Sequence, residues 1–442
     1  MSEAQAVERL VSWPDSRLKL TPAAAWLIDH GGEAMTMQAL IGGLCEKLLE
    51  EGLPLQRVNV ALPSMHPQVY ARAFTWVRGE GVTTVATNHD VRQSKEYFNS
   101  PVYAIHQGAA AIRRRLDLPN APMDYGILPE LKEKGVTDYL VLPMRFTQGP
   151  VSGVSDQGVQ RHVSFASFTT DRPGGFQPSE LSYLMELTPI MALRLEIEAA
   201  RRMTRDLLIT YLGRAPAKRV LKGNFIRGRS FEVEAAIWVC DMRGFTSISD
   251  RTPPAELIGM LDDYFEVMAR PVQQREGEVL KFIGDGMLAI FRTGDGNLQP
   301  GEDPRQAACR RALEAAKAAF EGLHELNQGR GIGGAPPLRA GIGLHYGRVL
   351  FGNVGATDRL DFTVIGRAVN EVARVEAATK TMGRPLLASD AFAEILGAGQ
   401  QGAGQQAFGE CKLESLGFHV LRGVPEPREL FGLPLKDIPG YT

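Results

Sequence analysis

The sequence predicts an α+β protein in which two domains are joined by a helical connector. Between about residues 32 and 187, strand candidates are mixed with helices and loops, whereas strands and helices alternate more regularly from about residue 231. Between these regions, residues 190–211 carry apolar side chains at spacings of three and four, which is typical of a helix with one apolar stripe. We therefore expect domains at 1–188 and 228–435 with a connector at 189–227.

The composition excludes several classes of protein. A length of 442 residues with 44% hydrophobic residues suits a globular protein of two or three domains. The net charge of −2 predicts no general attraction to nucleic acid or to an anionic membrane. No apolar run approaches the ~20 residues of a membrane-spanning helix, and the N-terminus lacks the pattern of a secretory signal. We expect a cytoplasmic protein.

The cysteines agree with that location. They are widely separated and form no CxxC pair, which argues against a structural zinc site and favours a reducing compartment. The four residues are Cys45, Cys240, Cys309 and Cys411.

The N-terminal domain begins with mixed residues, up to about residue 32, that we expect to be peripheral. One helix and three strands should follow, with a Gly/Ser-rich loop at 149–158 between the last two strands. The helix is expected at Met35–Leu53 and the strands at Arg57–Leu62, Tyr139–Phe146 and His162–Phe168.

A strand, a break and a helix close this domain. The strand Ser164–Phe168 is followed by the break Pro173-Gly174-Gly175-Phe176 and by a helix that opens at Pro178. This succession resembles a GAF-type sensory domain, which implies a regulatory role and a small-molecule ligand. An unrelated α+β regulatory domain, or one that only dimerises, fits the same pattern.

The connector carries an a/d pattern over three heptads and predicts a short parallel coiled coil. A packed amphipathic helix is the alternative. Gly213 should end the helix, with Pro216 just beyond. The seam residues are Ile190, Leu193, Ile197, Ala200, Thr204, Leu207 and Tyr211.

The C-terminal domain has the element order of a ferredoxin-like α+β fold. Residues 329–334 are rich in glycine and should form a flexible loop. The helices are expected at Pro253–Gln274, Pro304–Leu326 and Gly366–Thr381, and the strands at Glu232–Cys240, Val279–Ile283, Met287–Phe291, Leu338–His345, Val349–Val354 and Asp361–Ile365.

Two aspartates stand where apolar strands end. Asp241 follows a buried strand and precedes Gly244-Phe245-Thr246, whose backbone N–H groups would suit an anion. Asp285 lies in the turn Gly284-Asp285-Gly286. Taken singly, Asp241 could be a helix N-cap and Asp285 an ordinary turn residue. Taken together, two such acids suit a pair of divalent cations over phosphates.

Four segments in order resemble the catalytic domain of the class III nucleotidyl cyclases, the adenylate and guanylate cyclases, over residues 228–435. They carry Asp241-Met242-Arg243-Gly244-Phe245-Thr246, Leu280-Lys281-Phe282-Ile283-Gly284-Asp285-Gly286, the glycine-rich stretch 341–355, and the stretch 361–374. The resemblance implies that Asp241, Asp285 and the carbonyl of Met242 bind two Mg²⁺ or Mn²⁺ ions per site. It also places Phe245 and Thr246 at the substrate.

Lys281 and Thr363 match the family's two purine-reading positions. Lys281 suits N1 of adenine and Thr363 its 6-amino group, whereas guanylate-type members carry Glu at the lysine position. A solvated strand lysine is the plain alternative for Lys281. Thr363 also resembles the subgroup associated with bicarbonate stimulation, which would be contradicted if bicarbonate at fixed pH left turnover unchanged.

Asn370 and Arg374 lie four residues apart and should share one face of a helix. They match the family's transition-state pair, although a capping residue and a surface arginine would look the same. Arg422 stands where the family usually has a triphosphate-binding lysine, and Arg367 replaces a common aspartate without an evident reason.

The resemblance implies an adenylate cyclase that forms cyclic AMP and pyrophosphate from ATP. Each site would take metal ligands from one chain and base, ribose and phosphate contacts from another, so we expect a head-to-tail homodimer. The N-terminal domain would act through the connector. A guanylate or dual-specificity cyclase and a catalytically silent nucleotide-binding scaffold are the alternatives.

Overall fold

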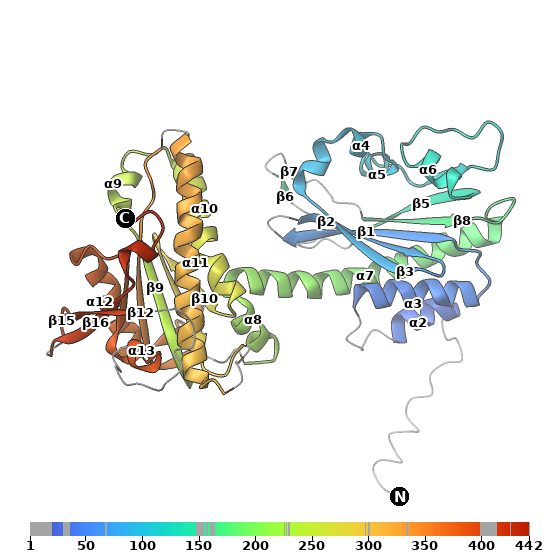
Figure 1. The fold of residues 1–442 in the computed structure, drawn as a ribbon. Coiled ribbons are helices and arrows are strands. Elements are labelled where there is room, and N and C mark those ends of the chain that lie inside the picture. Colours follow the sequence, from blue (N-terminus) through green and yellow to red (C-terminus); the bar gives the residue numbers. More distant parts are fainter. Residues whose placement is uncertain are drawn as a thin grey trace, which may run out of the picture. The chain divides into compact units, whose positions relative to one another are not determined.

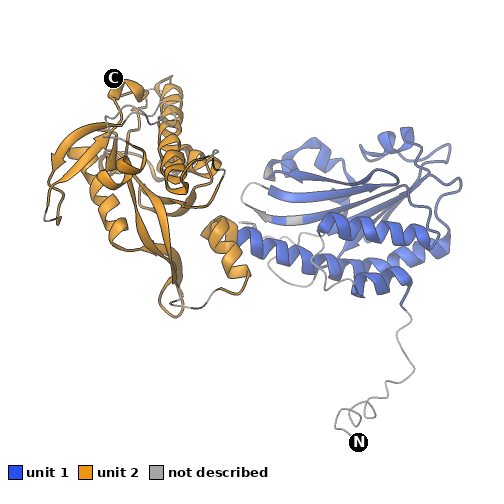
Figure 2. Cartoon of the chain, turned by 60° about the horizontal axis from the view of Figure 1, so that its bottom comes forward, with its two compact units in different colours: residues 1–207 blue, residues 208–442 orange. Residues whose placement is uncertain are grey.

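A computed structural model describes most of the chain as two compact units, residues 1–207 and 208–442 (Figure 2). The described residues are 20–29, 36–66, 69–146, 154–155, 158–159, 164–224, 226, 228, 230–296, 298, 301–332, 335–397, 413–424 and 426–441.

The N-terminal unit is built on a six-stranded sheet with the order β3-β2-β1-β8-β5-β4, in which every neighbouring pair is antiparallel. The strands are β1 Arg57–His66, β2 Val69–Val77, β3 Gly81–Thr87, β4 Ile112–Arg115, β5 Asp138–Met144 and β8 Ser164–Thr170. The short strands β6 Val154–Ser155 and β7 Gly158–Val159 pair with each other.

Helices cover both faces of this sheet (Figure 1). One face packs its large side chains, such as Phe74 and Trp76, against helices α2, α3 and α7. The other face lies under α4, α5 and α6, with Tyr139 and Phe165 in the core. The helices are α2 Pro22–Asp29, α3 Met37–Glu50, α4 Lys95–Phe98, α5 Pro101–His106, α6 Leu128–Glu133 and α7 Pro178–Leu212, with the 3-10 turn η2 His89–Gln93 before α4.

The structure corrects two expectations for this unit. Helix α2 is not peripheral, because Ala23 and Leu27 are fully buried in the core. The strands β2 and β3 were missed, since their side chains are mostly half-buried or exposed and give little periodicity. Of the expected loop at 149–158, only Val154–Ser155 and Gly158 lie within the described residues.

Helix α7 confirms the predicted helix through the connector and ends at Leu212, directly before Gly213. Its inner face carries Leu187, Met191 and Leu195, which are buried in the core of the N-terminal unit. The predicted seam lies on other faces, and Leu193 and Ile197 are about half exposed, at 54% and 50%. The helix therefore has a second apolar stripe that its own unit does not bury. Whether that stripe forms a coiled coil stays a prediction.

The C-terminal unit confirms the ferredoxin-like order. Its eight-stranded sheet has the order β10-β11-β9-β12-β14-β16-β15, and β13 pairs with β12 off this path. The strands are β9 Ser230–Met242, β10 Glu278–Ile283, β11 Gly286–Arg292, β12 Ala340–Gly355, β13 Leu360–Ile365, β14 Leu386–Ser389, β15 Glu414–His419 and β16 Arg428–Gly432.

Alternate residues of β9 face two separate cores. Trp238 and Cys240 pack with α10 and α11 on one face, and Ile237 packs with α12 on the other. This alternation is the period of two that a strand covered on both faces shows. The helices of this unit are α8 Arg214–Leu221, α9 Phe245–Ser249, α10 Pro254–Gln274, α11 Pro304–Ile332, α12 Arg367–Thr381 and α13 Asp390–Ile395, with η3 Leu435–Asp437 near the end.

Two expectations for this unit were wrong. The strands expected at 338–345 and 349–354 form a single strand, β12, of 16 residues, because Tyr346, Gly347 and Arg348 continue the pairing with β9. The expected glycine-rich loop is helical as far as Ile332, the last described residue before 335. The elements β14, α13, β15 and β16 were not anticipated.

None of the described helices is long and apolar enough to cross a membrane. Cys45, Cys240 and Cys309 are buried free thiols, while Cys411 lies outside the described residues. The cytoplasmic location stays a prediction.

A buried carboxylate on β10 makes the stability of the C-terminal unit depend on pH. Neither carboxylate oxygen of Glu278 has a hydrogen-bond partner within the described part of the chain, and Arg292 Nη2 is 3.9 Å away. Burial raises the pKa of Glu278 from 4.5 to about 7. Between these two values the folded protein holds a proton that the unfolded chain has released, so stability falls as the pH rises.

The substitution Glu278→Gln should remove this dependence. We expect the variant to be more stable than the unsubstituted protein at pH 8, by roughly 1–3 kcal/mol, and this advantage to be lost at pH 4. Urea unfolding followed by hydrogen exchange of the β9 and β11 amides measures the difference. The control Glu232→Gln changes an exposed carboxylate (60% exposed), and a gain at pH 8 as large as that of Glu278→Gln would contradict the assignment.

Candidate active site

The register of β9 against β11 brings the two predicted metal-binding carboxylates together. Cys240 pairs with Met287 across the two strands, so the next residue, Asp241, lies beside Gly286 and the turn that carries Asp285. Strand β9 ends at Met242 and β11 begins at Gly286, so both aspartates stand at the same edge of the sheet.

Two glycines shape the turn around Asp285. Gly284 has a φ of 62°, a left-handed conformation that other residues adopt at a cost. At Gly286 an added Cβ would lie 2.9 Å from the carbonyl oxygen of Cys240 and 3.4 Å from Asp241 Oδ1. Glycine at this position therefore leaves room for the carboxylate of Asp241 beside the turn.

The two carboxylates repel each other strongly. Burial and the negative charge of Asp285 raise the pKa of Asp241 from 3.8 to about 6, while the guanidinium of Arg243 lowers it. Two crowded carboxylates and a backbone carbonyl at Met242 are hard oxygen donors, the kind that Mg²⁺ and Mn²⁺ prefer. These residues therefore fit a divalent cation. Among the described residues, no group of three or more His, Cys, Asp or Glu side chains converges on one point.

A third carboxylate, Glu376 on α12, lies near this pair and is held by Arg243. The Arg243 Nη1 to Glu376 Oε1 distance is 3.4 Å, and both side chains are largely buried. Burial raises the pKa of Glu376, Arg243 lowers it, and the charge of Asp241 raises it further. Arg243 thus connects the end of β9 to α12 and offsets negative charge beside the aspartates.

The two predicted purine-reading residues lie on neighbouring strands. Strand β10 contacts β13, and Lys281 Nζ on β10 lies 3.5 Å from Asp361 Oδ2 on β13. Two residues along β13, Thr363 is 6% exposed and its hydroxyl has no hydrogen-bond partner among the described residues. A buried polar atom without a partner is costly and rare in a folded protein, so it is a good candidate for a ligand contact.

The predicted transition-state residues are accessible on α12. Asn370 is exposed and Arg374 is half-buried. The Nη2 atom of Arg374 lies 3.6 Å from the place a Cβ would take at Gly423. The fold therefore brings Arg374 to the β15–β16 connection, next to the exposed Arg422. Two arginines from distant parts of the sequence would suit an anionic phosphate group.

The remaining predicted positions have plainer surroundings. Phe245 opens the five-residue helix α9 after Gly244, whose φ is 74°, and its ring packs on the core. Thr246 is exposed.

Arg367, for which the sequence offered no explanation, donates a hydrogen bond to Glu371 Oε1 at 2.7 Å. Glu371 also lies 3.2 Å from the buried His345, so Arg367 has a structural partner.

Sequence reasoning missed Arg243, Asp361 and Glu376. Arg243 and Asp361 lie inside the recognised segments, but their charges gain meaning only from side chains brought close by folding. Glu376 stands two residues beyond Arg374 and carries no signal in the sequence.

Part of the C-terminal unit is similar to known proteins. Residues 231–410 match the family described as the adenylate and guanylate cyclase catalytic domain. This match lies within the C-terminal unit and includes the four motif segments.

Individual proteins are similar to parts of this chain. Adenylate cyclase 1 of Rhizobium meliloti (strain 1021) is 30% identical over 228 residues, which are 50% of this chain and 33% of the relative. An adenylate cyclase of Anabaena cylindrica is 38% identical over 164 residues, or 36% of this chain and 30% of the relative. The chain thus spans about a third of the length of these relatives. The crystal structure of the adenylyl cyclase CyaB from P. aeruginosa aligns with 47% of this chain and 96% of its own at a TM-score of 0.40 and 21% identity.

The Arg243–Glu376 pair offers a test that spares both aspartates. A Cβ added at Gly341 would lie 1.9 Å from Arg243 Nη2, so Gly341→Ala must displace the guanidinium. Glu376 then loses its partner, and negative charge accumulates beside Asp241 and Asp285. We expect kcat for the reaction proposed in the next subsection to fall roughly tenfold, the order of effect of one misplaced charge near a site.

The control is Gly259→Ala on α10, where an added Cβ meets nothing within 4 Å. Its kcat should match that of the unsubstituted chain. Circular dichroism would confirm that both variants are folded. A folded Gly341→Ala variant with unchanged kcat would show that Arg243 does not support the site.

Proposed function

We propose that the chain is an adenylate cyclase, which converts ATP to 3′,5′-cyclic AMP and pyrophosphate at sites shared by two copies. The observation that carries this proposal is the close pair Asp241 and Asp285, together with Lys281 on β10 and Thr363 on the neighbouring β13, whose buried hydroxyl has no partner among the described residues. Asp241 and Asp285 suit metal-bound phosphates, and Lys281 and Thr363 suit a purine.

The reaction needs no protein nucleophile. The ribose 3′-oxygen forms a bond to the α-phosphorus, the bond from that phosphorus to the bridging oxygen breaks, and the hydroxyl proton passes to solvent as pyrophosphate departs. Asp241 and Asp285 would hold the divalent metals, which when bound favour the 3′-alkoxide and offset charge on pyrophosphate. Asn370 would orient the ribose, and Arg374 would stabilise the transferring phosphoryl group. Arg422 would bind the triphosphate.

The chemistry around Lys281 favours adenine over guanine. A lysine donates a hydrogen bond, which N1 of adenine accepts, and the Thr363 hydroxyl can accept one from the 6-amino group. Guanine presents an acceptor and a donor in the opposite order. Guanylate or dual specificity is therefore the second candidate, and bicarbonate stimulation remains a prediction tied to Thr363.

A silent scaffold is the third candidate. It is disfavoured because every position that the chemistry requires carries a suitable side chain. The crowding of Asp241 and Asp285 would be a cost without benefit in a protein that binds no cation.

Two features support a shared site and regulation through the connector. Asn370 is exposed, and Arg374 lies beside the β15–β16 connection that carries Arg422, whereas Glu376 pairs with Arg243 near the aspartates. The exposed stripe of α7, with Leu193 and Ile197, would suit a parallel contact with a second copy. The N-terminal unit, proposed here as a GAF-like regulatory domain, would act by changing that contact.

Product analysis tests the substrate. The purified chain, incubated with ATP or GTP and Mg²⁺ or Mn²⁺, should form cyclic AMP from ATP, lose activity when the metal is chelated, and recover when it is returned. Asp285→Asn should lower kcat by a factor on the order of 10²–10³.

The matched control is Asp262→Asn, which changes an exposed carboxylate on α10. It should leave kcat unchanged. Cyclic GMP as the only product would overturn the substrate assignment. The absence of both products with either metal would favour the scaffold.

Mixing two inactive variants tests the shared site. Asp241→Asn damages the metal half and Asn370→Ala the ribose half, so a mixed dimer retains one intact site of two. Random pairing makes half of the dimers mixed, and we expect about a quarter of the unsubstituted activity.

A mixture of Asp241→Asn with Asp285→Asn is the control, because both changes damage the same half and no pairing can restore a site. Activity in the control mixture, or none in the test mixture when mixed dimers are demonstrated, would contradict a site shared in this way.

A further inference from the structure

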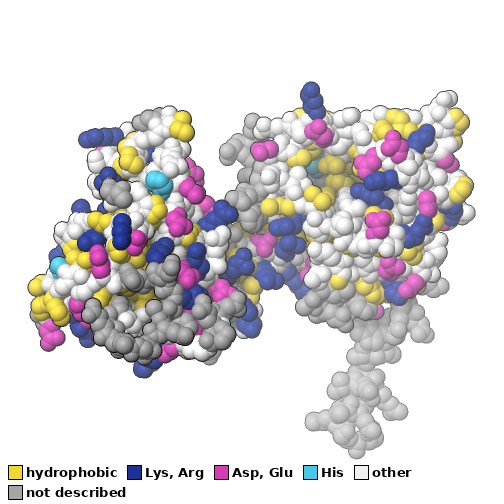
Figure 3. All heavy atoms as spheres, viewed as in Figure 1, with side chains coloured by type: hydrophobic (Ala, Val, Ile, Leu, Met, Phe, Trp, Pro, Cys, Tyr) yellow, Lys and Arg dark blue, Asp and Glu magenta, His cyan; other side chains and the backbone are white. Residues whose placement is uncertain are grey.

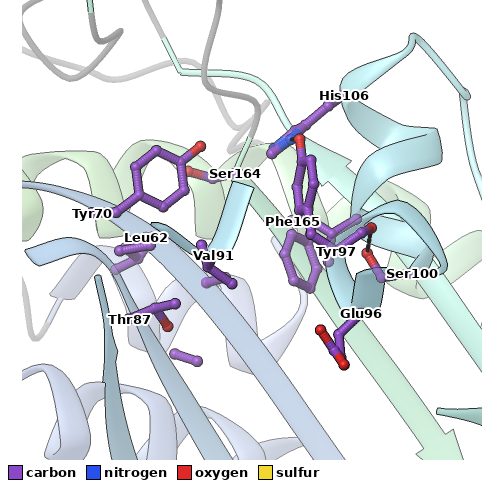
Figure 4. A pocket seen from close by; sticks show the side chains of 14 residues that line it. Leu62, Tyr70, Thr87, Val91, Glu96, Tyr97, Ser100, His106, Ser164 and Phe165 are labelled. Atoms are coloured by element: carbon purple, nitrogen blue, oxygen red, sulfur yellow. Dashed lines mark hydrogen bonds between the residues drawn. The ribbon is translucent and has the colours of Figure 1, made fainter. Parts of the chain in front are cut away.

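The N-terminal unit contains a cavity of about 290 Å³ that the proposed cyclase chemistry does not use. It lies between strands β1, β2 and β8 and the segment formed by η2, α4 and α5 (Figure 4). Figure 3 shows a hydrophobic hollow on this side of the unit. The volume is at the lower end of the roughly 300–1,000 Å³ of small-molecule sites.

Three alanines create the space. Ala71 and Ala73 alternate along β2 with Phe74 and Trp76, which fill the opposite face of the sheet. Ala61 pairs with Ala73, and the three alanines all line the cavity. Elsewhere the sheet is packed with large side chains, so the floor of this cavity is hollow because its residues end at Cβ.

Aromatic rings form the walls. Phe165 pairs with Ala61 across β1 and β8, and Tyr70 and Tyr97 stand over the floor (Figure 4). The Tyr97 ring lies 5.6 Å from that of Tyr103 in an edge contact, and its hydroxyl is 2.7 Å from His106 Nδ1. The wall is therefore held in place before any ligand arrives, which lowers the entropic cost of binding.

The polar groups in the cavity are few. Ser164 is 4% exposed, and its Oγ has no hydrogen-bond partner in the described part of the chain. Burial raises the pKa of both Tyr70 and Tyr97, so the phenols are neutral at physiological pH. Among the described lining residues the one carboxylate, Glu96, is exposed.

We propose that this cavity binds a small, uncharged, planar aromatic molecule that carries one hydrogen-bonding group directed at Ser164. Flat apolar walls favour a planar ring. A charged ligand would lose its hydration, which is unfavourable without a counter-charge in the cavity. The half-buried Arg92 packs on the Tyr70 ring at 5.8 Å but is not a lining residue. The proposal concerns the N-terminal unit alone and stands or falls independently of the cyclase activity.

Calorimetric titration of the full chain with indole tests the proposal. Indole is planar and neutral and has one N–H donor, whereas naphthalene has nearly the same shape and no donor. We expect saturable binding of indole with one site per chain. Ser164→Ala should weaken indole roughly 3- to 10-fold, as the loss of one hydrogen bond would, and leave naphthalene unchanged.

Blocking the floor gives a second test. Ala73→Leu places a larger side chain in the cavity and should weaken both ligands at least about tenfold. Ala86→Leu makes the same change at an exposed position of β3 outside the cavity and should have no effect. Circular dichroism checks that each variant is folded. If Ala73→Leu does not fold, the proposal is tested by the change that Ser164→Ala causes in the affinities for indole and naphthalene.

Three results would overturn the proposal. The first is no saturable binding of either neutral ligand. The second is equal binding by folded Ala73→Leu and Ala86→Leu variants. The third is tighter binding of the cation tryptamine or the anion indoleacetate than of indole, which would exclude an uncharged ligand class.

Discussion

The candidate site depends on the close approach of two carboxylates, Asp241 and Asp285, which repel each other but are held together by the register of β9 and β11. The pairing of Cys240 with Met287 places Asp241 against the turn of Asp285, and neither strand can shift without moving a whole buried face. The burial and crowding that raise the pKa of Asp241 are a cost to the free protein. A divalent cation bound at the proposed site would offset that cost, because the fold has already brought its two carboxylate ligands together. Arg243 and Glu376 then adjust the charge around it.

The groups proposed to hold the nucleotide keep hydrogen-bonding capacity that a ligand could use. Among the described residues, the buried hydroxyl of Thr363 has no partner. Lys281 has a 3.5 Å contact with the exposed Asp361, and Asn370 is exposed to solvent. A stable core seldom leaves a buried hydroxyl such as that of Thr363 in this state. Such groups are expected where a ligand completes the hydrogen bonds, and a second copy of the chain would bring the metal half to them.

The N-terminal unit uses the two faces of one sheet in different ways. One face is densely packed against α2, α3 and α7, and the other leaves a cavity over three alanines. Strand β8 contributes Ser164 and Phe165 to the cavity and leads along the chain into α7. Occupancy of the cavity would therefore act on the strand that precedes the connector, which is a physical route for a ligand to influence the helix.

The sequence alone determined the motif residues, the ferredoxin-like order and most helices, because these depend on local periodicity and on short segments. Asp241, Asp285, Lys281, Thr363, Asn370 and Arg374 could all be named from their segments. Only the tertiary structure showed burial, strand extent and contacts between distant residues, which no local sequence pattern contains. It showed that α2 is core, that β12 is a single strand, and that β2 and β3 extend the first sheet. It also paired Arg243 with Glu376 and opened the cavity over Ala61, Ala71 and Ala73. These features arise from contacts between residues far apart in the chain, and such contacts depend on strand register and burial rather than on the identity of neighbouring residues.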